Sequence, residues 1–112
     1  MAGSAGEIIT TLDDMTVFID GWYKGNLFNK DETLDMVIND FYVDMGPGMT
    51  YGLGCINLTN LSRGHAGQTF GFQAYSAALA NGYRFTMYAD DSALLTIWVP
   101  AITFSARLST EK

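Results

Sequence analysis

The spacing of apolar residues near the start of the chain predicts an amphipathic helix between Thr11 and Gly25. Thr11 is a typical N-cap residue, and Asp14 places a carboxylate at the third helical position. Gly25 stands where a helix commonly ends. Between them, apolar side chains recur every three or four residues, which puts them on one helical face directed at a core. These residues are Met15, Phe18, Ile19, Trp22 and Tyr23.

A second, shorter helix is expected after Asn29, because Asn29 to Glu32 repeats the pattern of a cap followed by a carboxylate. Residues 39–49 contain Gly46-Pro47-Gly48 and predict a loop. Acidic residues run through this part of the chain with a spacing that fits no calcium-binding loop, so they indicate a solvated face. They are Asp31, Glu32, Asp35, Asp40 and Asp44.

From Thr50 the pattern changes to one typical of strands. Apolar runs over Tyr51–Leu58, Gly71–Leu79 and Tyr83–Ala89 predict strands. The Asn81-Gly82 pair between the last two runs predicts a hairpin with a type I′ turn. A closing helix is expected over Ala93–Leu108, with Pro100 as an obstacle inside it. With one further strand around residue 65, the expected fold class is α+β, an antiparallel meander of four strands flanked by helices.

Composition narrows the possible functions. A length of 112 residues gives a single domain or a partial one over residues 1–112, and 48% hydrophobic residues exclude a disordered segment. The net charge of −6 argues against nucleic acid as a partner, since backbone binding needs clustered Lys and Arg. Cys55 is the sole cysteine, so no internal disulfide forms. No apolar run is long enough to span a membrane, and the first residues do not read as a signal peptide, so the compartment stays open.

Three stretches, in this order, resemble motifs from the C-terminal half of the penicillin-recognising serine hydrolases, the family of class C β-lactamases, D,D-peptidases, D-aminopeptidases and related esterases. The first stretch, Ser4 to Met15 with Gly25-Asn26-Leu27-Phe28, is similar to a family helix introduced by a small-residue segment and a Ser-Thr cap. The second is Tyr51-Gly52-Leu53-Gly54. The third is Gly64-His65-Ala66-Gly67, continuing to Phe72, and it resembles the family's "GHxGxxxGF" strand.

The resemblance implies the roles of particular residues. The His-x-Gly strand of this family is the counterpart of a Lys-Thr-Gly strand, which lines the active site and pairs edge-on with the substrate backbone. His65 and the backbone N–H of Gln68 would then act in catalysis, the latter as one of two oxyanion donors. Gly64, Ala66 and Gly67 would contact the substrate. Ala66 replaces the usual threonine, whose hydroxyl meets a substrate carboxylate, so an esterase- or aminopeptidase-like substrate is favoured over penicillin.

Two catalytic motifs of that family are missing. Tyr-x-Asn does not occur, and Ser-x-x-Lys occurs only as Ser109 to Lys112, in a terminal tail that cannot hold a nucleophile in place. The resemblance therefore implies part of a serine acyl-hydrolase whose nucleophile comes from an N-terminal part or a partner chain. The alternative is a non-catalytic module that binds a peptide or a subunit, or another copy of itself, at an open sheet edge. One His and one Cys make no metal-ligand set, and no cofactor is expected.

Overall fold

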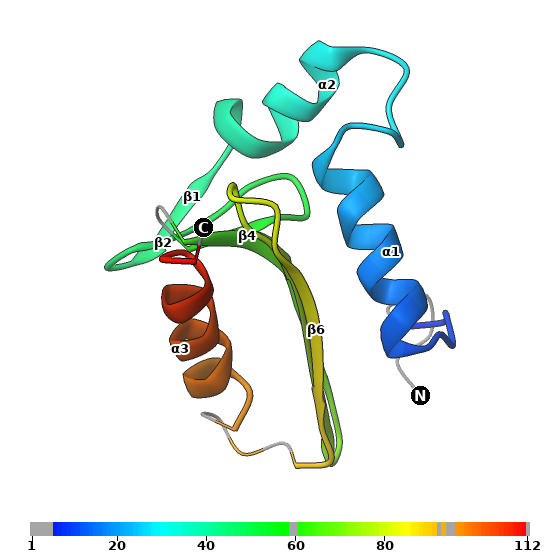
Figure 1. Ribbon diagram of the computed structural model, residues 1–112, viewed down its shortest axis with the longest axis vertical. Helices are drawn as coiled ribbons and strands as arrows, with labels where there is room; N and C mark the ends of the chain where they lie inside the picture. The colour runs from blue at the N-terminus through cyan, green and yellow to red at the C-terminus, as the bar shows by residue number, and fades with distance from the viewer. Residues whose placement is uncertain (1–5, 59–60, 92, 94–95, 112) are drawn as a thin grey trace.

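The computed structural model describes residues 6–58, 61–91, 93 and 96–111, and it has an α+β fold built on a six-stranded antiparallel sheet (Figure 1). Each strand pairs with the next one along the chain, in the order β1-β2-β3-β4-β5-β6. The strands are β1 (Val43–Gly46), β2 (Met49–Tyr51), β3 (Ile56–Leu58), β4 (Ser62–Thr69), β5 (Phe72–Ala78) and β6 (Arg84–Ala89). The predicted α+β class and antiparallel meander are confirmed.

Helices lie on both faces of the sheet. The first helix is α1 (Leu12–Tyr23), and α2 (Asp31–Asp35) continues into a π-helical turn, η1 (Met36–Asp40), before the last helix, α3 (Trp98–Leu108). Figure 1 shows α1 and α3 on opposite sides of β6. The main core lies between α3 and the sheet, where Tyr75 and Phe85 meet the rings of Trp98 and Phe104 on α3 edge to face. Its buried members are Ile56, Leu58, Tyr75, Ala77, Leu79, Phe85, Ile97 and Ala101.

The face of the sheet covered by α1 is more polar than the face covered by α3. Thr16 donates a hydrogen bond to the hydroxyl of Thr86 on β6 (2.8 Å), and Ser76 on β5 donates to the same hydroxyl (3.1 Å). Ile19 is the buried apolar residue of α1. Phe18, expected on the core face, is 52% exposed. The interface of α1 with the sheet is therefore held by hydroxyl bonds as well as by apolar contact.

Both ends of α1 follow the prediction. The Thr11 side chain accepts a hydrogen bond from the Asp14 backbone N–H (3.1 Å), which satisfies a donor that the first helical turn leaves free. At the other end Gly25 has φ of +79°, a conformation that glycine adopts without a steric penalty. The small-residue segment that begins at Ser4, ahead of this helix, lies partly outside the described residues, because these begin at residue 6.

The predicted loop over residues 39–49 is wrong. The helix runs on to Asp40, and two short strands, β1 and β2, occupy most of the remaining positions around the turn residues Pro47 and Gly48. The strand predicted over Tyr51–Leu58 is also wrong, because it is divided into β2 and β3. Gly52 marks the break: a Cβ there would lie 2.6 Å from the carbonyl oxygen of Val37, so the backbone turns where η1 packs against it.

The predicted hairpin between β5 and β6 is confirmed, but its turn is of another type. The Gly82 N–H donates to the Leu79 carbonyl (3.2 Å), which makes Ala80 and Asn81 the central residues of the turn. Leu79 N–H in turn donates to the Tyr83 carbonyl (2.9 Å), and Gly82 has φ of +98°. This is the three-residue loop with a bulge at a left-handed glycine rather than a two-residue type I′ turn.

Replacing Gly82 by valine should lower the free energy of unfolding by at least ~1 kcal/mol, because a β-branched side chain is strained at positive φ. Nothing lies within 4 Å of a Cβ built at this position, so the cost would come from the backbone and not from crowding. Urea unfolding followed by circular dichroism measures it. Ala80→Ser, at an exposed turn position, is the control. Equal stability of Gly82→Val and the parent chain would contradict the bulged turn.

The closing helix begins at Trp98 and not at Ala93 as predicted. Pro100 explains the difference, because it occupies the third helical position, where the backbone needs no N–H donor. Residues 92, 94 and 95 of the predicted helix lie outside the described residues. At the other end, the Asn81 side chain donates to the carbonyls of Leu108 (2.7 Å) and Glu111 (3.1 Å), which joins the hairpin to the end of α3. Within the described residues no helix is long and apolar enough to cross a membrane.

Candidate functional site

The five candidate site residues all lie on β4. His65 and Gly67 are exposed, whereas Gly64 is buried and Ala66 half-buried. His65 pairs with Ser76, which bonds to Thr86 below α1, so His65 belongs to the α1 face. Gln68 is exposed and already interacts with another group of the chain. The structure therefore places all five residues on one strand. Because successive side chains of a strand point to opposite faces of the sheet, the five residues are divided between the two faces.

The second half of β4 is paired on one side only, although β4 is an internal strand of the sheet. On one side β4 pairs with β5 along its length, down to Thr69 opposite Phe72. On the other side its pairing with β3 stops at Gly64, opposite Ile56. Beyond Gly64, none of the described strands pairs with β4 on the β3 side. We call His65–Thr69 on this side the β4 edge.

Ala66 on the β4 edge directs its backbone groups away from β5. Phe70 and Gly71 form a two-residue loop, and the pair that closes such a loop, Thr69 and Phe72, exchanges hydrogen bonds. Along an antiparallel ladder, hydrogen-bonded pairs alternate with pairs that are not hydrogen-bonded. The N–H and C=O of Gly67 therefore bond to β5, whereas those of Ala66 point to the open side. An extended chain could pair with Ala66 as an added strand.

His65 is held by a tyrosine from a neighbouring part of the sheet. The hydroxyl of Tyr51, the last residue of β2, lies 2.9 Å from His65 Nε2, and the two rings meet edge to face with centroids 5.6 Å apart. When the hydroxyl donates, Nε2 accepts and the neutral ring carries its proton on Nδ1. The contact thus orients the imidazole. No spacing along the chain indicates this contact, although both residues belong to the motifs that resemble the hydrolase family.

Gly64 has a structural reason to be glycine. A Cβ built there would lie 1.9 Å from the carbonyl oxygen of Ser76 and 2.8 Å from the Cα of Ala77. The backbones of β4 and β5 therefore approach too closely for any side chain. Gly67 differs, because nothing lies within 4 Å of a Cβ built there. Of the two glycines expected to contact substrate, Gly64 is required by packing, and Gly67 borders open space.

None of the serines that the structure describes is placed as a nucleophile. Ser62 and Ser105 are buried and bond to one another (3.0 Å). Ser76 faces His65 across the ladder, but its hydroxyl donates to Thr86 instead. Ser109 donates to a carbonyl in the last turn of α3, as expected of a terminal tail, and the lysine of its Ser-x-x-Lys lies outside the described residues.

Two buried groups next to β4 are kept neutral. Burial raises the pKa of the Cys55 thiol, because the low-dielectric surroundings disfavour the thiolate. Burial likewise raises the pKa of the Tyr75 hydroxyl, which lies 3.5 Å from Ser62 Oγ. A thiol with a raised pKa is a poor nucleophile, so both groups belong to the core and not to the site. Among the residues that the structure describes, no cluster of three His, Cys, Asp or Glu side chains could hold a metal ion.

Comparisons with protein-family models, with curated proteins and with solved structures find no match for this chain.

Proposed function

We propose that this chain supplies the His-x-Gly strand of a serine acyl-hydrolase, and that the nucleophilic serine comes from another segment or another chain. The observation that carries the proposal is the β4 edge: the strand with His65 extends past β3 and leaves one side open where a substrate backbone would pair. This is the arrangement that the resemblance to penicillin-recognising hydrolases implies. We also propose that the fold of this chain corresponds to the C-terminal half of the fold of those hydrolases.

In this proposal the β4 edge orients the substrate by backbone pairing. An acylated peptide or ester laid antiparallel to β4 bonds to Ala66, and its carbonyl reaches the backbone N–H of Gln68 as the negative charge develops. A donor fixed in a ladder needs no reorganisation during the reaction, which is why one such donor contributes ~10²–10³ in rate. Gly67 has no side chain to obstruct this approach, in keeping with the open space around it.

His65 acts beside the incoming serine. Its exposure leaves the ring accessible, and Tyr51 fixes the orientation of Nε2. When the Tyr51 hydroxyl donates to Nε2, Nδ1 carries the proton and can donate to a group on the substrate or on the serine. Ala66 offers no hydroxyl to a substrate carboxylate at this position. An ester or an aminoacyl compound is therefore the proposed substrate class.

The chain on its own should hydrolyse neither nitrocefin nor p-nitrophenyl esters, and a fluorophosphonate probe should leave it unlabelled, because the described serines are buried or remote from His65. Mass spectrometry of the probe-treated chain measures this. Stoichiometric labelling of any serine would contradict the incomplete site.

The decisive experiment adds the missing part. The segment encoded immediately upstream in the same genome is expected to carry Ser-x-x-Lys and Tyr-x-Asn, and co-expression with this chain should produce probe labelling on that serine together with ester hydrolysis. His65→Gln should then lower the rate by ~10²-fold. Thr103→Ala, exposed on α3, is the matched control and should keep the full rate. An upstream segment without these motifs, or equal activity of His65→Gln, would overturn the proposal.

The second candidate is a non-catalytic module that binds a peptide or a second subunit by strand addition. One observation favours it: β6 ends the sheet and pairs only with β5 among the described strands. In that case the bound strand pairs with β6, whereas a hydrolase substrate pairs with the β4 edge. Amide exchange separates the two, because the binding partner protects backbone N–H groups of one strand or the other.

A further inference from the structure

We infer that a cavity between the end of α1 and the start of β4 binds a small organic carboxylate through Arg63. The cavity measures about 320 Å³. That volume is at the lower end of the range for small-molecule pockets and far above the ~30 Å³ that one water occupies. It does not include His65, and the inference does not depend on the proposed hydrolase function.

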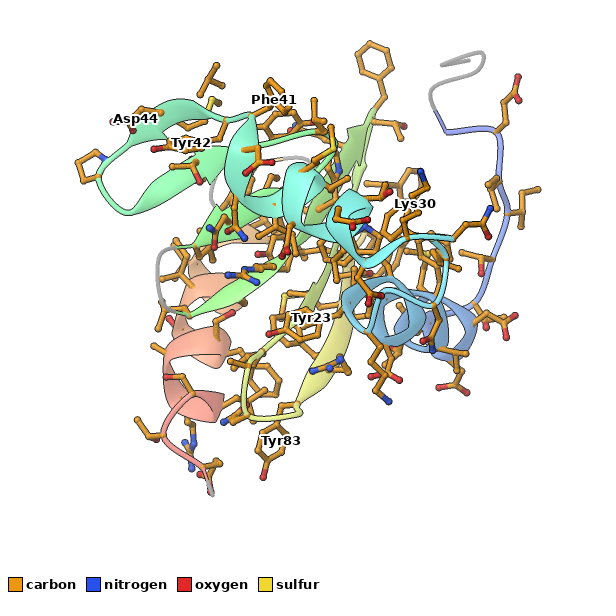
Figure 2. The ribbon with its side chains drawn as sticks, turned by 90° about the horizontal axis from the view of Figure 1, so that it is seen from above. Tyr23, Lys30, Phe41, Tyr42, Asp44 and Tyr83 are labelled. Atoms are coloured by element: carbon orange, nitrogen blue, oxygen red, sulfur yellow. The ribbon has the colours of Figure 1, made fainter. Side chains whose placement is uncertain are left out.

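The cavity arises from one row of residues across the sheet. Asn57 on β3, Arg63 on β4, Ala78 on β5 and Arg84 on β6 are neighbours in register. Ala78 is small, and it lines the cavity together with Asn57 and Arg63. Tyr23, the last residue of α1, also lines the cavity, and Figure 2 shows Tyr23 over the strands, within the outline of the molecule.

Arg63 has no counter-ion among the described residues. Arg63 is half-buried, and its guanidinium makes neither a hydrogen bond nor an ion pair with them, although it has five donors to satisfy. The neighbouring Arg84 is already engaged: it bonds to Asp20 (2.8 Å) and to the Leu79 carbonyl (2.8 Å), and its guanidinium carbon lies over the Tyr23 ring, 4.4 Å from the centroid. Asp20 is itself shared with Lys24 (2.6 Å), so it does not neutralise Arg63.

The chemistry of the lining selects the ligand class. Arg63 presents the planar fork that binds a carboxylate through two parallel bonds. Asn57 and Tyr23 also line the cavity, and their polar side-chain groups make no hydrogen bond with any described residue. Leu61, Ala78 and Ala80 supply apolar contact for a short carbon chain. None of the described residues that line the cavity is acidic, and the single cation among them, Arg63, matches one negative charge better than a phosphate dianion.

Nuclear magnetic resonance titration of the folded chain with butyrate, butyramide and inorganic phosphate tests the inference. Butyrate should cause saturable shifts at the amides of Leu61, Arg63 and Ala78, whereas butyramide, which has the same shape without the charge, should bind at least ~10-fold more weakly. Because the chain has a net charge of −6, non-specific attraction of butyrate is disfavoured. Phosphate binding as tight as butyrate would overturn the assignment to a carboxylate.

Variants identify the group responsible. Arg63→Gln should lower the affinity for butyrate at least ~10-fold. Arg63→Lys keeps the charge without the planar fork, so its affinity should lie between those of the parent chain and Arg63→Gln. Arg107→Gln, exposed on α3, is the control and should bind as the parent does. Dispersed amide signals show that each variant is folded. Unchanged binding by Arg63→Gln, or the absence of saturable shifts in the parent, would refute the site. If a variant fails to fold, the comparison of butyrate with butyramide on the parent chain still tests whether the site recognises a carboxylate.

Discussion

Replacing Gly64 by alanine is expected to remove at least ~3 kcal/mol of stability, a large part of the ~5–15 kcal/mol that holds a domain of this size together. The added Cβ would meet the Ser76 carbonyl oxygen at 1.9 Å. Real carbon–oxygen contacts are never that short, and the obstacle is backbone in the adjacent strand, which no change of rotamer can relieve. Strands β4 and β5 would have to separate at the centre of the sheet.

Thermal and urea unfolding by circular dichroism measure this loss. Gly67→Ala is the matched control, because it makes the same substitution on the same strand with nothing within 4 Å of the new Cβ. That variant should be neutral or slightly stabilising, since alanine restricts the unfolded chain. Equal stability of the two variants would show that β4 and β5 do not approach as closely as described.

The contrast between these glycines shows where sequence reasoning reached its limit. The resemblance treated Gly64 and Gly67 alike, as residues that let a substrate approach. In the structure one is buried against Ser76 and Ala77, and the other is exposed. A glycine in a sequence says only that a side chain is absent. What occupies the space depends on the register of β5, which places Ala77 opposite Gly64.

Elements with strong local signals were predicted well. The helix α1 was found because the cap at Thr11 and the helical spacing agree, and the β5–β6 hairpin was found because Asn81-Gly82 separates two apolar runs. The turn type was missed because the Asn81 side chain is bound at the end of α3, a contact that no local pattern reveals. Tertiary contacts decided this detail.

The short strands were missed for a different reason. The strands β1 and β2 have four and three residues, too few for alternation to be recognised. Their turn residues were therefore interpreted as a loop. The missed strands also hid the contact between Tyr51 and His65, because that contact exists only once β2 pairs with β3 and β3 with β4. The candidate site could be placed on a strand from sequence, but its neighbours could not.

The isolated chain is expected to self-associate at high micromolar concentration through β6, the last strand of the sheet. Leu79 and Tyr83 form a hydrogen-bonded pair, and such pairs alternate with pairs that are not hydrogen-bonded along the ladder. The N–H and C=O groups of Arg84, Thr86 and Tyr88 therefore point away from β5. Strand edges in soluble proteins are usually protected by proline or several charges, and β6 has only Arg84, already bound to Asp20. The side chain of Phe85 on the same strand is buried in the core.

Size exclusion with light scattering measures the association, and two substitutions at one position identify its cause. Tyr88 is 55% exposed, and Tyr88→Pro removes an outward N–H while leaving the bonds of Phe85 and Met87 toward β5 in place. This variant should elute as a monomer. Tyr88→Thr removes the same ring, which stacks on Phe72, but keeps the N–H, and it should associate as the parent does.

If both variants are monomeric, the apolar surface rather than the strand edge joins the copies. A sharp monomer peak from the parent chain at the same concentration would show that the β6 edge is already protected, and strand addition at β6 would then be excluded for a second copy of this chain.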